Sequence, residues 1–339
     1  MEKVRQKRND WFDVVKFIAS FFVVCIHIPL IGGDFEIAVD AIARFGVPTF
    51  FAISGFFIVG VNADGVKSRL IKILGLYIIS AAIYHANSVV GLISNHGIRG
   101  LVDYVCGVFF NLGNICNFVF LNIPFTSVHL WYLLALLYVY LIWLVILKKS
   151  LGDRAILLIG TVTLSVNLVL GELLSAFGVV LDYVLVRNFA FTGLPFFIFG
   201  YLLRKYNHLF EKIKPIYLIF AIVIGSCEAA VSRFLVGHNE VFIGSVLCCF
   251  AVVLLADKLK SKEVPAKYLP LFRSSTDVYV FHLLFMGFLS WLVSFLPPAV
   301  KAVAIALMPL LVFALCIAFS LVKYRIIKAI KCRKAIKHP

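Results

Sequence analysis

The chain has 339 residues, of which 62% are hydrophobic and only 14% are charged, and its mean hydropathy is +1.02. This composition excludes a soluble globular domain and indicates a polytopic membrane protein. The formal net charge of +15 does not require a nucleic-acid partner, because the basic residues of membrane proteins collect in cytoplasmic loops. We therefore expect an all-α protein that contacts membrane lipid and no nucleic acid.

Hydrophobic segments of near-spanning length recur along the chain and predict about ten transmembrane helices in a single membrane domain, 1–339. The basic start is followed by a long apolar run without an A-x-A cleavage site, so we expect a retained signal anchor. Region 96–128 is apolar enough to contain a re-entrant or interfacial segment, but Gly, Asn and Pro interrupt it, so we expect a packed loop outside the membrane. The expected spans are approximately 11–30, 45–60, 73–95, 129–147, 154–172, 189–203, 215–232, 240–256, 277–295 and 300–322.

Most of the 32 lysine and arginine residues fall on one side of these spans. This bias places both termini, including a basic tail at 323–339, in the cytoplasm. Cys106 and Cys116 share the long outside loop, where they either form a disulfide in an oxidising compartment or remain free thiols. The basic inside segments are 1–10, 61–72, 148–154, 204–214, 257–276 and 323–339.

The first expected span carries four polar residues at helical spacing. Asp13, Lys16, Ser20 and His27 occupy positions i, i+3, i+7 and i+14, which lie along one side of an α-helix. Ionisable groups within a span are costly, so they usually face a protein interior or a water-filled cavity and mark function. The spacing therefore predicts a polar path along this helix, with an imidazole near its outer end.

The next hairpin adds two further features. Arg44 stands at the outer end of a segment containing Pro48 and the Ser54–Gly55 pair, which lets a helix bend or another backbone come close. Arg69 and Lys72 then share one helix face at the cytoplasmic entrance of the third span. They are either topology-setting charges or an anchor for phosphate groups.

Six motifs occur in an order that resembles the acyltransferase-3 family of integral membrane acyltransferases. The chain departs from the usual family pattern at Lys16 and Lys72, where arginine is usual, and lysine lacks the planar fork that binds phosphate in bidentate fashion. The matching pieces are D-x-x-K-x10-H at Asp13, Lys16 and His27; VPTFFAISGFF at 47–57; the pair Arg69 and Lys72; HLWYL at 129–133; LPFFIFGYLL at 194–203; and STDVYVFH at 275–282.

The resemblance implies a stand-alone enzyme of the bacterial inner (cytoplasmic) membrane, without a metal. It implies transfer of an acyl group, expected to be acetyl, from cytoplasmic acetyl-CoA to a hydroxyl of a cell-surface or envelope glycan, which is either a polymer or lipid-linked. His27 is expected to act as a general base or as a transient acyl carrier, together with Asp13 and Lys16. Lys16, Arg69 and Lys72 are expected to hold the acyl-CoA phosphates.

Five further residues are candidates for acceptor binding. They are Arg44, His129, Trp131, Glu228 and His282. The alternative role of His129 and Trp131 is that of interfacial anchors. Glu228 and His282 lie inside expected spans and either line a cavity or cross-link helices.

Two other classes of function remain open at this stage. A transporter or flippase that exports a polysaccharide or a small polar metabolite is the main alternative, although such proteins typically contain two matching halves with interrupted helices. A non-catalytic membrane scaffold would not need a charged stripe inside a span. The polar stripe and the basic inner segments favour the acyltransferase.

Overall fold

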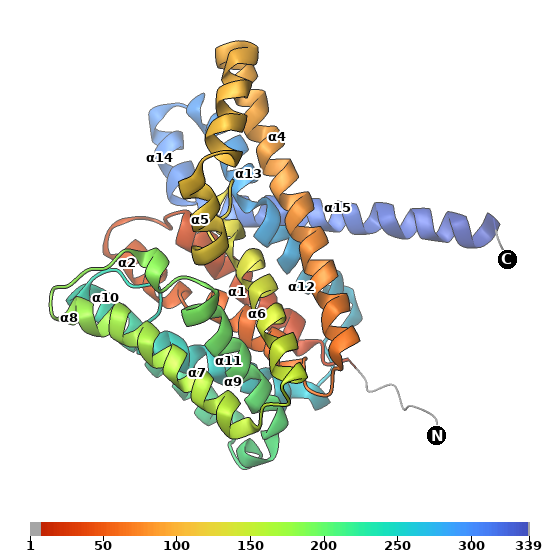
Figure 1. Ribbon diagram of the computed structural model, residues 1–339. Coiled ribbons are helices and arrows are strands. Elements are labelled where there is room, and N and C mark those ends of the chain that lie inside the picture. The colour runs from red at the N-terminus through yellow and green to blue at the C-terminus, as the bar shows by residue number, and fades with distance from the viewer. Residues whose placement is uncertain (1–7, 338–339) are drawn as a thin grey trace. The chain divides into compact units, whose positions relative to one another are not determined.

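The computed structural model describes residues 8–337, and only the backbone at 94–96 and 332–337. All regular elements of this part of the chain are helices (Figure 1), which confirms the all-α class. Seven of these helices are long and apolar enough to cross a membrane, or eight if one bent pair counts as a span. The protein is therefore a multi-pass membrane protein. The outermost parts of the basic end segments, 1–7 and 338–339, lie outside the described residues.

Three of the expected spans correspond to helices shorter than the others. The first is α1 (Trp11–His27), with 17 residues, and another is α11 (Ile243–Lys258), with 16. The third combines the π-helix η4 (Phe189–Gly193) with α9 (Leu194–Lys205). At 1.5 Å per residue, a helix of the length of α1 covers about 26 Å, slightly less than the hydrocarbon core of a typical bilayer.

The first of two compact units comprises 1–50, 210–235 and 242–339. Its helix α1 packs against α2, α11, α13 and α15, so α1 is the central element of this unit. Buried apolar residues of α1, α13 and α15, including Val24, Val278 and Val312, form a common core. The other helices are α2 (Gly33–Ala43), the first half of α3 (Gly46–Phe56), α10 (Pro215–Val236), α12 (Leu269–Phe272), α13 (Ser275–Ser294), α14 (Pro298–Ala306) and α15 (Met308–Lys337).

The second unit comprises 51–209 and 236–241. Within it α4 packs against α6, and α7 packs against α9. Its remaining elements are the second half of α3, α4 (Ala63–Phe109), α5 (Leu112–Leu121), η1 (Val128–Leu130), α6 (Trp131–Lys148), α7 (Asp153–Leu168), the π-helix η2 (Val169–Leu173), α8 (Leu174–Ala176) and η3 (Tyr183–Leu185).

Glycines bring α3 and α9 into backbone contact within the second unit. A Cβ atom added to Gly55 would lie 1.8 Å from the carbonyl oxygen of Phe197, and one added to Gly200 would lie 2.0 Å from that of Ala52. No larger residue fits either position without moving a helix. Of the two roles expected for the Ser54–Gly55 pair, a helix bend or a close approach of another backbone, the structure shows the close approach. It is the small-residue packing common between membrane helices.

Helix α4 begins at Ala63, ahead of the expected span 73–95. The Asn62 side chain accepts a hydrogen bond of 2.9 Å from the Gly65 N–H, and Asp64 stands in the first turn. Both features stabilise a helix N-terminus. Arg69 and Lys72 therefore lie in the second and third turns of α4, and their role at the cytoplasmic entrance stays a prediction.

The structure contradicts the packed loop expected at 96–128. Helix α4 continues through a kink at Gly97, whose φ of +63° is in the left-handed region, and α5 follows. After the kink, the segment Gly97–Phe109 and helix α5 make an angle of 46° with each other. Asn111 caps the start of α5 and Asn122 adopts a left-handed conformation at its end, so residues that indicate a loop act here as helix caps. Cys106 and Cys116 on these helices are free thiols, so the disulfide alternative is not realised.

The last expected span, 300–322, is divided between two helices. Pro298 starts α14, which ends at Ala306, and α15 begins at Met308 with Pro309 in its first turn. Proline is tolerated in the first turn of a helix but not in its interior, so it marks both starts. The helix that can cross a membrane here is Met308–Lys331.

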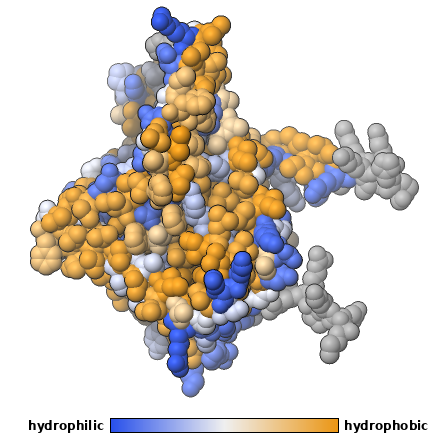
Figure 2. Space-filling model, viewed as in Figure 1, coloured by the Kyte–Doolittle hydropathy of each residue, from blue (hydrophilic) through white to orange (hydrophobic). Residues whose placement is uncertain are grey.

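The exposed faces of the long helices are apolar. Figure 2 shows hydrophobic residues over the visible surfaces of α4 and α7, where Ile71, Ile78, Ile79, Leu158 and Val162 are more than half exposed. Exposed apolar faces of this extent indicate contact with lipid. Polar residues in the helices consequently stand out as candidates for function.

Candidate functional site

The polar stripe of α1 faces the interior of the first unit. Asp13 is 2% exposed and Ser20 is also buried, whereas Lys16 and His27 are partly buried. The Ser20 hydroxyl donates to the Phe17 carbonyl of its own helix, at 2.7 Å. The expected clustering on one side is confirmed for this helix, although Ser20 serves its own backbone.

Asp13 lies at the centre of an ionic cluster. Its carboxylate forms ion pairs with Lys16 at 2.6 Å, with Arg8, and with Arg273 at 3.3 Å. Arg273 also contacts Asp10 at 3.0 Å. A carboxylate that accepts from three cations is held in its ionised form and has little capacity left to act as a base. This geometry favours a positioning role for Asp13, which holds Lys16.

Arg8 and Arg273 were not among the expected site residues. Arg8 was assigned to the basic segment that sets topology, and Arg273 to an inside loop two residues before the STDVYVFH motif. Burial alone would lower the pKa of Arg273, but hydrogen bonds to Asp10 and Asp13 outweigh it and raise the pKa above its usual value. The proximity of Arg273 to that motif was the only signal in the sequence.

His27 meets a second imidazole from a distant part of the chain. The ring of His282, on α13, lies with its centroid 5.2 Å from that of His27 and tilted by 37°. His282 is fully buried, and its Nδ1 lies 3.1 Å and 2.9 Å from the carbonyl oxygens of Val278 and Tyr279. Carbonyl oxygens only accept hydrogen bonds, so in the neutral ring Nδ1 carries the proton and Nε2 carries the lone pair.

The position of His27 at the end of its helix suits an imidazole that gains a proton. His27 is the last residue of α1, where the helix dipole favours a positive charge. His282 is fixed on α13, which is in turn attached to α15: the Asp277 carboxylate accepts from Ser320 at 2.6 Å and pairs with Lys323. The two histidines therefore lie on two helices, α1 and α13, that are both held by polar contacts. The structure places His282, expected to bind the acceptor, against the candidate base.

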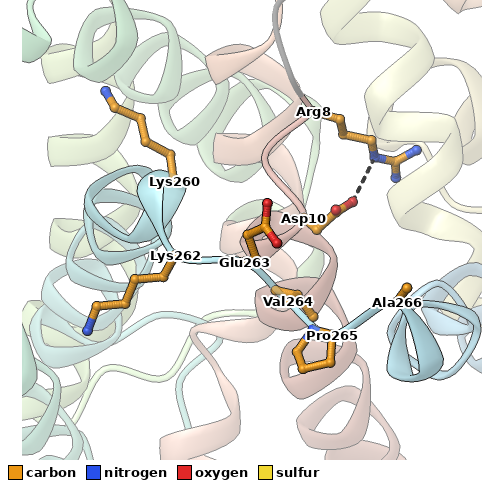
Figure 3. Close-up of a pocket in the computed structure, with 8 residues that line it drawn as sticks. All are labelled: Arg8, Asp10, Lys260, Lys262, Glu263, Val264, Pro265 and Ala266. Carbon is orange, nitrogen blue, oxygen red and sulfur yellow. Dashed lines mark ion pairs between the residues drawn. The ribbon is translucent and has the colours of Figure 1, made fainter.

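A shallow hollow lies beside the ionic cluster in the first unit. Its lining includes Arg8, Asp10, Lys260, Lys262 and Glu263. Figure 3 shows Arg8 turned to Asp10, an ion pair of 3.6 Å, while both lysine side chains extend away from the hollow. The carboxylates of Asp10 and Glu263 point toward its centre instead. An anion would meet these carboxylates first, so the hollow is a poor candidate for a phosphate site.

The two basic residues of α4 have different surroundings in the second unit. Arg69 donates to the Phe57 carbonyl at 2.7 Å and hydrogen-bonds to the Tyr140 hydroxyl. Lys72 is exposed and forms no hydrogen bond or ion pair with the described residues. Arg69 thus has a structural role in joining α3, α4 and α6. Lys72 keeps its charge available for a ligand.

Two of the expected acceptor-binding residues in the first unit have internal partners. Arg44 is 6% exposed and pairs with Asp40 at 2.6 Å, and Arg233 approaches the same carboxylate at 3.6 Å. Glu228 accepts from the Ser232 hydroxyl at 2.8 Å and from the N–H of Gly244 at the start of α11. Glu228 therefore links α10 to α11, which was the structural alternative for this residue.

The two expected acceptor-binding residues of the second unit adjoin α6. His129 is 1% exposed, with its Nδ1 2.7 Å from the Ser127 hydroxyl and its ring 4.8 Å from that of Tyr84. The Trp131 ring lies under the guanidinium of Arg187, at 5.5 Å. The structure brings neither into contact with another expected site residue of the same unit, and their acceptor role stays a prediction.

The comparisons with known proteins include one match to a family model. Residues 9–324 match the family model of the acyltransferase-3 family, described as "Acyltransferase domain". This match covers His27, His282 and the ionic cluster from Asp10 onward. No curated protein and no solved structure matches the chain in the corresponding comparisons.

Proposed function

Because the chain belongs to the acyltransferase-3 family and is a multi-pass membrane acyltransferase, we propose that it uses cytoplasmic acyl-CoA as the donor. The acyl group is acetyl, and the acceptor is a hydroxyl of a cell-surface or envelope glycan, either polymeric or lipid-linked. The membrane is the bacterial inner membrane, with both termini in the cytoplasm. The distribution of basic residues along the sequence supports this orientation.

The contact between His27 and His282 is the observation that carries this proposal. In the transfer step, the acceptor hydroxyl gives its proton to the His27 imidazole while its oxygen attacks the thioester carbonyl. The C–S bond breaks, and the CoA thiolate takes the proton back, leaving an ester and free CoA. A base in this position must be neutral before reaction, because a protonated imidazole cannot accept the hydroxyl proton.

His282 supports the step by its fixed orientation. Its Nδ1 proton is directed to the carbonyls of its own helix, so the lone pair of its neutral ring is on Nε2. A neutral imidazole in a fixed orientation beside His27 limits the positions that the His27 ring can take. Because the His282 ring is uncharged, it does not repel the positive charge that His27 acquires. The alternative in which His27 itself carries the acyl group would use the same nitrogen lone pair as a nucleophile.

Of the three residues expected to hold the acyl-CoA phosphates, Lys16 and Lys72 keep this role in the proposal. Lys16 is held by Asp13 on the helix that ends in His27, and Lys72 is exposed on α4. Charge-assisted hydrogen bonds from such groups suit the phosphates of acyl-CoA. Arg69 contributes by holding the helices together, since its guanidinium already has backbone and phenol partners.

The test is transfer by purified wild type and His27→Ala protein with radiolabelled acetyl-CoA and envelope glycan. We expect the variant to bind acetyl-CoA normally but to lose transfer by about 10²–10⁴-fold, the usual contribution of a general base. His208→Ala, which removes an exposed imidazole, is the matched control. The wild-type rate should also fall as the pH is lowered, because protonation of the imidazole removes the lone pair that accepts the hydroxyl proton. A folded His27→Ala protein that transfers acetyl at the wild-type rate would exclude this mechanism and favour a transporter.

A further inference from the structure

The second unit contains a hollow that no part of the mechanism above uses. It has a volume of about 500 Å³ and lies where the π-helix η2, the segment 180–186 and the segment 238–240 meet. Its size is within the range of small-molecule sites, about 300–1,000 Å³. Its polar lining consists of Ser175, Asp182, Tyr183, His238, Asn239 and Glu240.

Asn239 lines this hollow and contributes a buried amide group with an unsatisfied atom to its wall. Its side chain is 5% exposed, and its Oδ1 accepts a hydrogen bond from the Ser175 hydroxyl at 3.1 Å. Its Nδ2 has no hydrogen-bond partner among the described residues. If the amide nitrogen and oxygen were exchanged, the oxygen would be the atom without a hydrogen-bond partner. Buried polar groups are nearly always paired, so this one calls for an external partner.

An aromatic ring forms part of the same wall. Tyr183 is 43% exposed, and the guanidinium of Arg187 covers one face of its ring at 4.1 Å. Arg187 is itself held by Glu240, at 3.9 Å, and stacks on Trp131. The tyrosine is thus a fixed apolar surface beside polar groups. It also connects the hollow to Trp131, a residue that the sequence assigns to acceptor binding.

The charges of the lining argue against an anionic ligand. Glu240 is paired with Arg187 and lies 3.8 Å from His238. Asp182 is exposed, and its carboxylate accepts only a backbone hydrogen bond from Val184 among the contacts found in the described residues. Free carboxylate oxygens accept hydrogen bonds from hydroxyl groups, whereas they repel phosphates and carboxylates. The site suits a neutral ligand that both donates and accepts.

The backbone around the hollow departs from regular helix. Residues 169–173 form the π-helix η2, in which Gly171 lies under Asn239: a Cβ added there would be 3.7 Å from the amide oxygen. Such π-helical turns interrupt the regular hydrogen-bond pattern and are frequent at functional sites. The turn therefore positions one wall of the hollow against the Asn239 amide.

We propose that this hollow binds a saccharide ring of the acceptor. A sugar provides hydroxyl groups for the Asn239 amide and the Asp182 carboxylate, and it provides an apolar C–H face for the Tyr183 ring. The inference rests on the proposed function, because it assigns the site to the glycan on which the enzyme acts. It concerns recognition only and requires no contact of this hollow with acyl-CoA.

The experiment measures saccharide binding in the absence of acyl-CoA. The full chain is placed in lipid nanodiscs, because maltoside detergents carry sugars of their own. Saturation-transfer NMR is then recorded with methyl glucoside, methyl galactoside and methyl N-acetylglucosaminide. We expect saturation transfer to at least one of the three, with the binding weakened about five-fold or more in Asn239→Ala. Tyr183→Ala should weaken it about three- to ten-fold, and Tyr183→Phe should keep it.

Two controls make the outcomes decisive. Asn87→Ala removes an exposed amide of α4 outside the hollow and should bind like wild type, and thermal unfolding shows that each variant is folded. Absence of saturation transfer in the wild type, equal binding in Asn239→Ala and wild type, or displacement of the glycoside by inorganic phosphate each overturns the inference. Asn239-dependent binding together with a wild type that transfers no acetyl overturns the proposed function and leaves the saccharide site standing.

Discussion

His27 in the first unit and His129 in the second are both histidines of the motifs that resemble the family, yet their neighbours differ. His129 is held by the hydroxyl of Ser127, two residues before it, and by the ring of Tyr84 on α4. His27 lies against His282, which comes from the other end of the chain. A hydroxyl and a phenol ring fix an imidazole in place, whereas a second imidazole offers another site for a proton. Under the proposed function, we therefore expect the neighbours of a histidine, and not its burial, to distinguish a structural role from a catalytic one.

Of the substitutions that test this comparison, the one at His282 is expected to have the largest effect. His282→Phe keeps a ring of similar shape against His27 but removes both nitrogens, and we expect acetyl transfer to fall about 10²-fold because His27 loses its orienting partner. The measurement is the transfer rate across a pH series, alongside acetyl-CoA binding. His282→Asn, which retains polar atoms, should recover part of the rate and show a shifted pH profile. A His282→Phe enzyme with wild-type rate and pH profile would reduce the contact to packing.

A smaller effect is expected at the ionic cluster of the first unit. Asp13→Asn preserves shape but removes the charge that three cations share, and it should lower the free energy of unfolding by about 1.5 kcal/mol. This is the lower end for hydrogen bonds to charged groups, because Arg8 and Arg273 are largely exposed. Thermal unfolding measures it. Asp64→Asn, which breaks an exposed pair with Lys67 and removes an exposed charge from the first turn of α4, is the control and should cost about 0.5 kcal/mol or less. Equal behaviour of the two variants would mean that burial of Asp13 adds nothing.

The smallest effect is expected at His129. His129→Phe should leave acetyl transfer within a few-fold of wild type and cost about 1 kcal/mol of stability, since it removes one neutral hydrogen bond, to Ser127. Ser127→Ala should have a similar effect on the unfolding transition. A loss of transfer in His129→Phe as large as that in His27→Ala would return His129 to the acceptor site and end the distinction drawn above.

Local signals in the sequence misled where a residue type has two uses. Gly97, Asn111 and Asn122 indicate a loop at 96–128, but in the structure the glycine permits a kink and the two asparagines cap a helix. Asn62 likewise caps the start of α4, ahead of Arg69 and Lys72. A cap and a loop contain the same residues, because both satisfy free backbone groups with a short polar side chain. Only the backbone conformation separates them.

The sequence by itself determined the membrane class, the face that Asp13, Lys16 and His27 share, and the small residue that permits a close approach at Gly55. These properties follow from composition, from the 3.6-residue period and from the size of a side chain, so they need no knowledge of a neighbour. The pairing of His27 with His282, the Arg273 contact to Asp13 and the unsatisfied Asn239 amide were decided by tertiary structure. Helical spacing defines which side of a helix is polar, but which helix lies opposite depends on packing between segments that are far apart in the chain.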